Sequence, residues 1–596
     1  MKINPIESIL SGMTIVEINA LKPTREPYLA LLLQPNGDIV GTSHRIGHDV
    51  PRDAFAQCKA FLSLAVEKFA DLVVTPEYCL PWTNVHQIAE GDESLRPKIG
   101  AIWVLGCESS SLTDLATFAA RANAAGHYCV YETIDPGKAA RSSYVDPLVY
   151  VFWCKNSQVP DEHVLTFVVQ FKTEPCKDKL DVEQMNLYCG DTVYEFNTGS
   201  ENIRMLTLIC SDSFKFTQDL VKDHHRNHLL IHIQLNPSPD DAAYARYRDH
   251  LYDFGCTTNA ELLCLNWAAE VKEREDDGKQ KSWKNNSNSI WYVPRPGFNA
   301  EEKHIEQQHQ AGLYYSRISK FWHGFFIHPE PHAILLKKQK AAILREPAIL
   351  APKVCAEVTG RWVWSAGSET FTPSEANDGF SASLKNYDRL SQLTDLSKTS
   401  NIAVERAIEF LMKPSGPPEN WYNIEHIGAL TVVPNDSMTR VTVNIHRDPK
   451  SPGLAARKAR LQRAQDALSI SGRGLVAWTF PLKWLESGFH LSWRPDAPHC
   501  NVVADNKQEE ASVIFIGDES NLDVVKTAYQ YGRAALESGW SQRRQAGEAT
   551  TEELASVSDR LAVLYRKDHD LRLYISEDNQ SITRTPEVAA SSIVGE

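Results

Sequence analysis

Short apolar runs alternate with longer amphipathic segments through the first 370 residues. Residues 55–69 carry apolar side chains at helical spacing, whereas several shorter apolar runs have the length of buried strands. This alternation of strands and helices is typical of a layered α/β domain. The predicted strands are residues 28–34, 72–74, 103–106, 149–153, 164–172, 205–210, 229–236 and 262–267.

The apolar pattern weakens between residues 365 and 383, where Ser, Thr, Gly and Asn predominate. Such composition predicts a linker, and therefore a first domain at residues 1–370 and a second at residues 384–596. A polar, lysine-rich stretch at 270–288 predicts an exposed loop within the first domain. The second domain is predicted to be α+β, with helices at 403–412, 521–536 and 551–565 and strands at 430–433, 440–445, 512–516 and 571–575.

Two of the predicted strands end close to an ionisable or reactive side chain. The run at 72–74 leads to Glu77, and the run at 205–209 leads directly to Cys210. An apolar run that stops at such a residue delivers its side chain to the end of a sheet. Lys172 ends a third run, and Glu183 follows in a polar segment. These four side chains form a candidate catalytic set.

Thiol chemistry gives each of these residues a role. A neutral thiol is a weak nucleophile, so Cys210 needs a base or a positive neighbour, and Glu77 is the candidate base. Attack on an amide or nitrile carbon builds negative charge, which Lys172 and the backbone N–H of Ser211 could stabilise. Glu183 would hold Lys172 or steer the leaving amine and the hydrolytic water. The set therefore predicts a thiol acyl-transfer site.

The local contexts of these residues resemble the signatures of the nitrilase, or carbon–nitrogen hydrolase, superfamily. ADLVVTPE ends at Glu77, QFKT contains Lys172, and LICSD contains Cys210. Glu183 stands seven residues before a Gly–Asp pair, as the family's second glutamate does. The resemblance spans residues 10–365, and the order and spacing of the motifs carry it together.

The resemblance implies a nitrilase-like α-β-β-α sandwich that self-associates through a helical face into a homo-oligomer. It also implies a Glu-Lys-Cys triad of Glu77, Lys172 and Cys210, supported by Glu183 and with Ser211 beside the developing oxyanion. No metal or organic cofactor is implied. The segment 213–215 reads Ser-Phe-Lys where relatives carry an Arg-Phe pair that shapes the acyl pocket, so the substrate stays open.

The predicted activity is hydrolysis of a non-peptide carbon–nitrogen bond in a small amide, nitrile or carbamoyl substrate, through a thioester on Cys210. The same intermediate would allow acyl transfer. Two alternatives stay open. A catalytically dead scaffold would keep the nitrilase fold and lose one catalytic group. A regulated effector or assembly subunit would bind a protein partner through residues 384–596.

Composition narrows the class of protein further. A chain of 596 residues can bury the cores of two or more domains. Its net charge of −14 argues against broad nucleic-acid binding. No apolar stretch reaches the ~18 to 20 residues of a membrane helix, and the first residues lack the pattern of a secretory signal. Twelve cysteines without a CxxC pair predict reduced thiols and a cytoplasmic protein.

A group of four histidines invites comparison with a zinc site. His224, His225, His228 and His232 lie close together in sequence. Zinc sites need further ligands at recognisable spacing, and the flanking sequence offers none. We therefore expect no metal site here.

Overall fold

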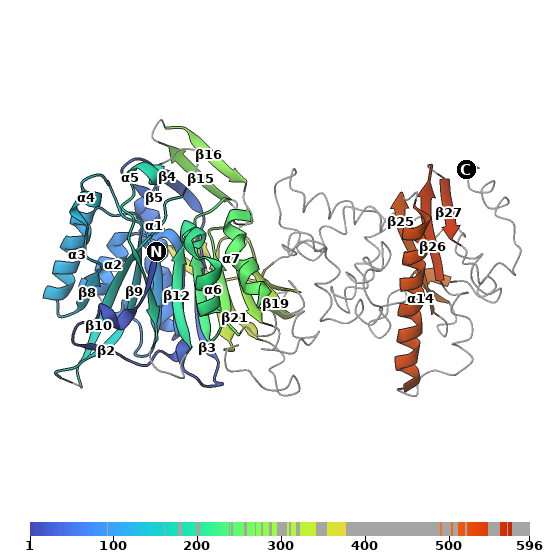
Figure 1. Cartoon of the computed structure of the whole chain (residues 1–596), viewed down its shortest axis with the longest axis horizontal. Coiled ribbons are helices and arrows are strands. Elements are labelled where there is room, and N and C mark those ends of the chain that lie inside the picture. The colour runs from blue at the N-terminus through green and yellow to red at the C-terminus, as the bar shows by residue number, and fades with distance from the viewer. Residues whose placement is uncertain are drawn as a thin grey trace, which may run out of the picture. The chain divides into compact units, whose positions relative to one another are not determined.

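The computed structural model describes most of residues 1–376 and several elements beyond them (Figure 1). Two compact units divide the chain, residues 1–376 and 377–596. Within the first unit the gaps are residues 92, 160, 177–181, 198–202, 238, 240–241, 255–258, 269, 276–277, 285–288, 295–306, 309–310, 318–321 and 341–354. In the second unit the described residues are 489–491, 502–504, 510–518, 521–545, 561–568 and 570–574.

A ten-stranded sheet carries two of the predicted site residues. Its order is β22-β21-β20-β3-β6-β7-β9-β10-β8, and β2 pairs with the C-terminal end of β9. The central strands β3, β6 and β7 are parallel and almost wholly buried, as their continuous apolar runs predict. The strands are β2 (Met13–Ile15), β3 (Tyr28–Gln34), β6 (Leu72–Leu80), β7 (Ile102–Cys107), β8 (Tyr128–Tyr131), β9 (Pro147–Asn156), β10 (His163–Phe171), β20 (His332–Lys338), β21 (Ala356–Ser365) and β22 (Thr370–Pro373).

An eight-stranded sheet carries the predicted nucleophile. Its order is β1-β11-β12-β13-β14-β17-β19-β18, and β12, β13 and β14 run parallel. Parallel strands bring their carboxyl ends to one edge, where ligands are commonly bound. The strands are β1 (Lys2–Pro5), β11 (Thr192–Phe196), β12 (Arg204–Ile209), β13 (His228–Ile233), β14 (Glu261–Leu265), β17 (Ile290–Pro294), β18 (Leu313–Arg317) and β19 (Trp322–Ile327).

The inner faces of the two sheets pack against each other. The rings of Tyr150 and Phe152 on β9 lie 4.9 and 5.3 Å from the ring of Phe196 on β11. Gln170 Nε2 on β10 also donates to the Thr207 carbonyl on β12 at 2.9 Å. The two sheets therefore share one core.

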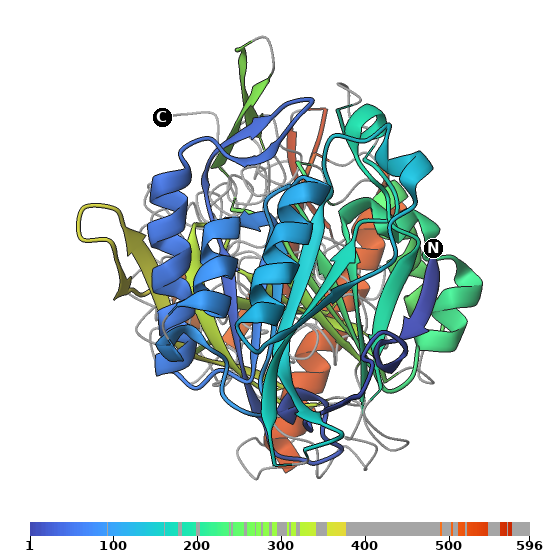
Figure 2. The ribbon, with the colours of Figure 1, turned by 90° about the vertical axis from the view of Figure 1, so that its left-hand side faces the viewer.

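Helices cover the outer faces of both sheets. Apolar side chains of α1 (Pro51–Glu67), α2 (Trp82–Glu90) and α3 (Leu112–Ala124) join the core of the ten-stranded sheet, and Figure 2 shows these blue helices lying over its strands. On the eight-stranded sheet, α7 (Ala242–Asp253) packs through Tyr247 onto β13, and α6 (Gln218–His224) lies against α7. The short elements are α4 (Pro136–Ala139), α5 (Val182–Asn186), η1 (Ile6–Ser8), η2 (Asn19–Leu21), η3 (Glu93–Leu95) and η4 (Cys210–Lys215).

Two expectations for the first unit were wrong. The stretch at 270–288 forms a hairpin of β15 (Glu270–Glu275) and β16 (Gln280–Lys284), which joins β4 (Gly37–Gly41) and β5 (Ile46–His48) in a four-stranded sheet. Residues 285–288 lie outside the described residues. The side chain of Val271 is buried, and backbone hydrogen bonds pair β15 with β16 and with β4, which the polar composition did not reveal.

The predicted linker at 365–383 begins inside the first unit. Its first half forms the β21–β22 hairpin, and residues 377–383 lie outside the described residues. The ring of Phe371 packs 6.4 Å from that of Phe61 on α1 and 5.3 Å from that of Trp364. A polar turn between two strands has the same composition as a linker, which is why the sequence alone misplaced it.

The described residues of the second unit include a five-stranded sheet and one long helix. The order is β23-β24-β25-β26-β27, and α14 (Leu522–Gln545) shares a core with β25 and β26. The predicted strands at 512–516 and 571–575 and the helix at 521–536 coincide with β25, β27 and α14. The segments 403–412, 430–433 and 440–445 lie outside the described residues. The strands are β23 (Phe489–Leu491), β24 (Val502–Ala504), β25 (Glu510–Asp518), β26 (Leu561–Lys567) and β27 (Asp570–Tyr574).

The predicted helix at 551–565 was wrong in its last turn. Residues 561–565 are the buried part of β26, which pairs with strands on both sides. A short apolar run has no periodicity that separates a buried strand from a buried helix. Residues 551–560 lie outside the described residues.

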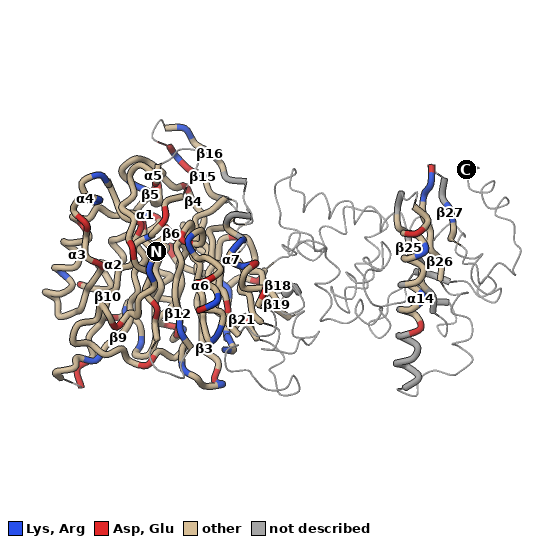
Figure 3. Tube along the Cα trace, viewed as in Figure 1, with Lys and Arg blue, Asp and Glu red and all other residues tan. Residues whose placement is uncertain are grey.

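Charged residues of both signs are interspersed along the described trace of the first unit (Figure 3). Among the helices that the structure describes, none combines the length and the apolar character needed to cross a membrane.

Fragments that end at residue 376 and at residue 365 test where the first unit ends. The shorter fragment loses β22 and the half-buried Phe371, so urea denaturation followed by tryptophan fluorescence should show a free energy of unfolding lower by about 2 kcal/mol. Phe371→Ala in the full chain is the matched control and should reproduce most of that loss. Equal stability of the two fragments would show that β22 does not belong to this unit.

Candidate active site

Glu77 lies where β6 breaks its register. Pairing of β6 with β7 shifts between Thr75 and Leu80, and Tyr78 adopts a positive φ of 56°. The neighbouring strand can approach because Gly106 has no side chain, since a Cβ there would lie 2.2 Å from the Pro76 carbonyl oxygen. The Glu77 carbonyl accepts a 2.7 Å hydrogen bond from Trp267 Nε1. These contacts turn the Glu77 carboxylate, which is 1% exposed, into the protein interior.

Lys172 follows β10 directly and is wholly buried. Its Nζ lies 2.7 Å from Glu77 Oε1 and 2.7 Å from Glu183 Oε1. Burial alone would lower the pKa of Lys172, but the charges of Glu183 and Glu77 outweigh it and raise that pKa well above its usual range. The side chain is therefore an ammonium ion at neutral pH.

Glu183 on α5 holds the lysine and is itself held. Its Oε1 accepts from Tyr78 Oη at 2.9 Å as well as from Lys172, and its Oε2 accepts from the Cys176 backbone N–H at 2.6 Å. Hydrogen bonds to a charged group are stronger than neutral ones and fix its position. Glu183 thus joins the segments that carry Glu77, Lys172 and Cys176.

Asp146 is the third carboxyl group around Lys172. Its Oδ2 lies 3.5 Å from Nζ, farther than the two glutamates. Burial, followed by the charge of Glu77, raises the pKa of Asp146 well above its usual range. Glu77, Asp146 and Glu183 bring their oxygens within 4.8 Å of one another, a distance compatible with a metal ion, but the Lys172 ammonium already lies among them.

Cys210 begins the 3-10 turn η4 immediately after β12. Its φ of 43° is unusual for a residue with a side chain and costs of order 1–3 kcal/mol. The Cys210 carbonyl oxygen lies 2.8 Å from His232 Nε2, which donates to it, and Asp212 Oδ2 accepts from the Ile209 N–H at 3.1 Å. Asp212 Oδ1 also accepts from the Thr173 N–H at 2.7 Å. The turn is thereby tied to the segment after Lys172.

Ser211 has a buried side chain that bonds away from the thiol. Its Oγ donates to the Glu174 carbonyl at 2.6 Å. The hydroxyl therefore fixes the loop after Lys172 against the turn at Cys210. The role foreseen for the Ser211 backbone N–H beside an oxyanion stays a prediction.

A second thiol lies beside the candidate nucleophile. Cys176 Sγ is 3.2 Å from Tyr244 Oη, and Cys210 Sγ is 4.0 Å from the same oxygen. A hydrogen bond from the Cys210 thiol lowers the pKa of Cys176. The same bond, together with burial, raises the pKa of Cys210 well above its usual range. A thiol whose pKa is raised in this way needs a base to become a nucleophile.

The structure brings together all four side chains that the sequence singled out. Glu77, Lys172 and Glu183 are in direct contact, and the charges of Glu77 and Lys172 both act on the Cys210 thiol. Sequence reasoning missed Tyr78, Asp146, Cys176 and Tyr244 as site residues. Tyr78 and Cys176 adjoin recognised motifs, so proximity in sequence could have suggested them. Asp146 and Tyr244 lie in segments whose sequence contains no motif that indicates a site.

No family model matches the sequence, and no curated protein matches it. Nitrilase-superfamily amidases and carbon–nitrogen hydrolases are among the solved structures that are similar to the chain. An amidase from Nesterenkonia sp. is 10% identical, with 55% of this chain and 96% of the amidase covered and a TM-score of 0.27. A carbon–nitrogen hydrolase from Helicobacter pylori G27 is 12% identical, with coverages of 45% and 83% and a TM-score of 0.26.

A glutamine-dependent NAD+ synthetase from Acinetobacter baumannii is also similar, at 11% identity and a TM-score of 0.25. The match covers 45% of this chain and 41% of the synthetase, so the chain spans about two fifths of that protein. Similarity at these levels gives no ground for an activity. The contacts within the site supply that ground.

Replacing Lys172 should destabilise the whole first unit. Lys172→Met leaves Glu77 and Glu183 buried without their cation, which costs about 3–5 kcal/mol of unfolding free energy. Lys155→Met, at an exposed position of β9, is the matched control and should change stability little. Urea denaturation of both variants measures the difference, and a loss below about 1 kcal/mol for Lys172→Met would contradict the ion-pair network.

Proposed function

We propose that this protein is a cysteine hydrolase of the nitrilase type, which cleaves a non-peptide carbon–nitrogen bond in a small amide, nitrile or carbamoyl compound. One observation carries the proposal. The buried Lys172 ammonium is bound by Glu77 and Glu183 at 2.7 Å each, and the charges of Glu77 and Lys172 act on the Cys210 thiol. A purely structural ion pair would not need a thiol in a strained turn beside it.

Glu77 would serve as the general base. Its Oε1 binds Lys172 and its Oε2 accepts the Leu235 N–H at 2.6 Å, so the carboxylate is fixed in position and keeps a lone pair on Oε2. As sulfur attacks the substrate carbon, Glu77 takes the thiol proton and the new S–C bond forms. Glu77 then gives this proton to the nitrogen as the C–N bond of an amide breaks. Water then attacks the thioester while Glu77 takes one of its protons, the C–S bond breaks, and that proton passes to the Cys210 sulfur as the acid leaves.

Lys172 would stabilise the charge that develops on the substrate oxygen. An ammonium group has three N–H donors, and Glu77 and Glu183 take one each through short bonds. Asp146 lies farther, at 3.5 Å, which leaves the third donor for the substrate. The Ser211 backbone N–H would be the second oxyanion donor.

The surroundings of the thiol favour a small acyl group. The ring of Phe214 lies 4.7 Å from the ring of Tyr244, and Tyr244 Oη is 4.0 Å from Cys210 Sγ. Tyr244, which packs against Phe214, would limit the space beside the nucleophile. A cytoplasmic location, self-association and a partner-binding role for residues 384–596 complete the proposal, and they rest on the sequence alone.

Covalent labelling tests the assignment of the nucleophile. Fluoroacetamide is a suitable probe because it has the shape of a small amide, and peptide mass mapping locates the adduct. Labelling should occur at Cys210, fall by ~10² to 10⁴-fold in Glu77→Gln, and persist in the matched Cys176→Ala variant. Iodoacetamide would also label Cys176, whose pKa is lowered by its bond from Cys210. Undiminished labelling in Glu77→Gln, or a preference for buried Cys79, would overturn the assignment.

The acid limb of the pH profile tests Glu77 separately. Burial raises the pKa of Glu77 above the ordinary value of 4.5, and a protonated Glu77 cannot take the thiol proton. The labelling rate of the Cys176→Ala variant should therefore fall with decreasing pH, with a midpoint above 4.5. A midpoint at or below that value would remove Glu77 from the role of base.

A further inference from the structure

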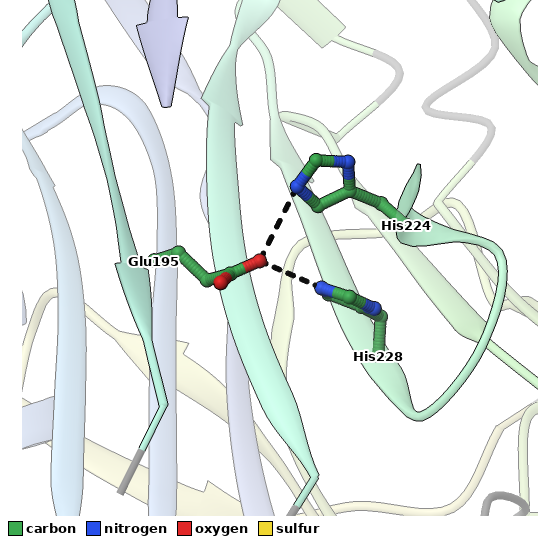
Figure 4. A group of neighbouring side chains, drawn as sticks. All are labelled: Glu195, His224 and His228. Carbon is green, nitrogen blue, oxygen red and sulfur yellow. Dashed lines mark hydrogen bonds and ion pairs between the residues drawn. The ribbon is translucent and has the colours of Figure 1, made fainter. Parts of the chain in front are cut away.

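Two histidines and a glutamate converge at the other end of the eight-stranded sheet (Figure 4). Glu195 lies on β11, His224 ends α6, and His228 begins β13. His228 pairs with Arg204, the first residue of β12, whereas Cys210 follows the last residue of that strand. Six residues of strand separate the two places by about 20 Å. The cluster is therefore distinct from the candidate active site.

The three ligand atoms point at one another. His224 Nε2 lies 3.2 Å and His228 Nε2 2.8 Å from Glu195 Oε1, and all three atoms lie within 4.8 Å of one another. Ligand atoms of a tetrahedral zinc ion, bound at about 2.0–2.2 Å, stand roughly 3.3 Å apart. The side chains already have nearly this spacing, and all three are buried.

The opposite nitrogen of each ring fixes its tautomer. His224 Nδ1 lies 2.6 Å from the Leu220 carbonyl oxygen, and His228 Nδ1 lies 2.7 Å from that of Arg226. A carbonyl oxygen only accepts, so both Nδ1 atoms carry the proton. In the neutral imidazole each Nε2 then directs a lone pair at the Glu195 carboxylate, and these two electron-rich groups repel each other. A cation between them would attract both and make the arrangement favourable. Zinc-bound histidines characteristically donate their second nitrogen in this way.

We propose that Glu195, His224 and His228 bind one divalent zinc ion, with a water molecule as the fourth ligand. Zinc accepts the combination of two imidazoles and one carboxylate. Arg204 Nη1 lies 3.6 Å from Glu195 Oε1, but this side chain is 32% exposed and can turn toward solvent. The histidine spacing is visible in sequence, whereas the third ligand, Glu195, comes from another strand.

The ion would fasten α6 to the sheet. The chain passes from Cys210 through η4 and α6 to His224, so zinc would anchor the far end of the segment that starts at the thiol. The cluster lies away from the thiol, so the ion would act on the fold of this segment and would not touch the reacting groups.

Metal analysis of the full chain tests the site. Purified protein should contain about one zinc per chain, and the stripped protein should bind Zn²⁺ or Co²⁺ at about one equivalent, with Co²⁺ giving the visible absorption of a four-coordinate site. His224→Gln and His228→Gln should weaken Co²⁺ binding roughly 100-fold or more. Loss of a residue that only hydrogen-bonds to a metal ligand already weakens metal binding by roughly 10- to 100-fold, and these variants remove a ligand itself. His225→Gln is the matched control, because that ring stacks on Phe254 instead, and it should bind as the unaltered chain does.

The unaltered chain provides a test that does not depend on the folding of variants. Removal of the metal should lower the melting temperature, and added Zn²⁺ should restore it, because binding to the native state alone stabilises that state. Glu195→Gln keeps the shape of the side chain and should abolish this response. Folded protein without zinc, Co²⁺ binding or a thermal response to Zn²⁺ would overturn the proposal and identify the cluster as an ion pair.

Discussion

A buried ammonium ion needs nearby negative charge, and this constraint at Lys172 organises the first unit. Isolated burial of such a charge would cost several kcal/mol, and the two glutamates at 2.7 Å offset this cost. Each partner comes from a different part of the chain: Glu77 from the broken end of β6, Glu183 from α5, and Lys172 from the end of β10. The ion cluster therefore holds three separate segments in one arrangement.

Two of the strained backbone positions lie next to this cluster. Tyr78 and Cys210 both adopt positive φ, and both are fixed by contacts with its surroundings: Tyr78 Oη donates to Glu183, and the turn at Cys210 is tied through Asp212 to Thr173. Such backbone conformations persist where neighbouring structure determines them strongly, and they are frequent at active sites. The thiol pair adds an electrostatic constraint, because the contact between them raises the pKa of Cys210 and lowers that of Cys176.

The strands and the four principal site residues could be predicted because both depend on local pattern. Apolar runs mark β3, β6, β10 and β12, and the ionisable residues at their ends mark the site. Features that depend on contacts between distant segments could not be predicted. Asp146 approaches Lys172 only through the pairing of β9 and β10, and Glu195 meets His224 and His228 only through the order of strands. Polar composition also concealed the hairpins β15–β16 and β21–β22, whose backbone bonds need little apolar side chain.

The central claim is that Cys210 carries an acyl group as a thioester. Hydroxylamine intercepts thioesters, so incubation with acetamide or propionamide and hydroxylamine should yield the corresponding hydroxamate with the unaltered chain. It should yield none with Cys210→Ala, and the Cys176→Ala control should still form it. Ammonia release without hydroxamate, hydroxamate formation by Cys210→Ala, or a folded chain that produces neither from any small amide or nitrile would contradict the account.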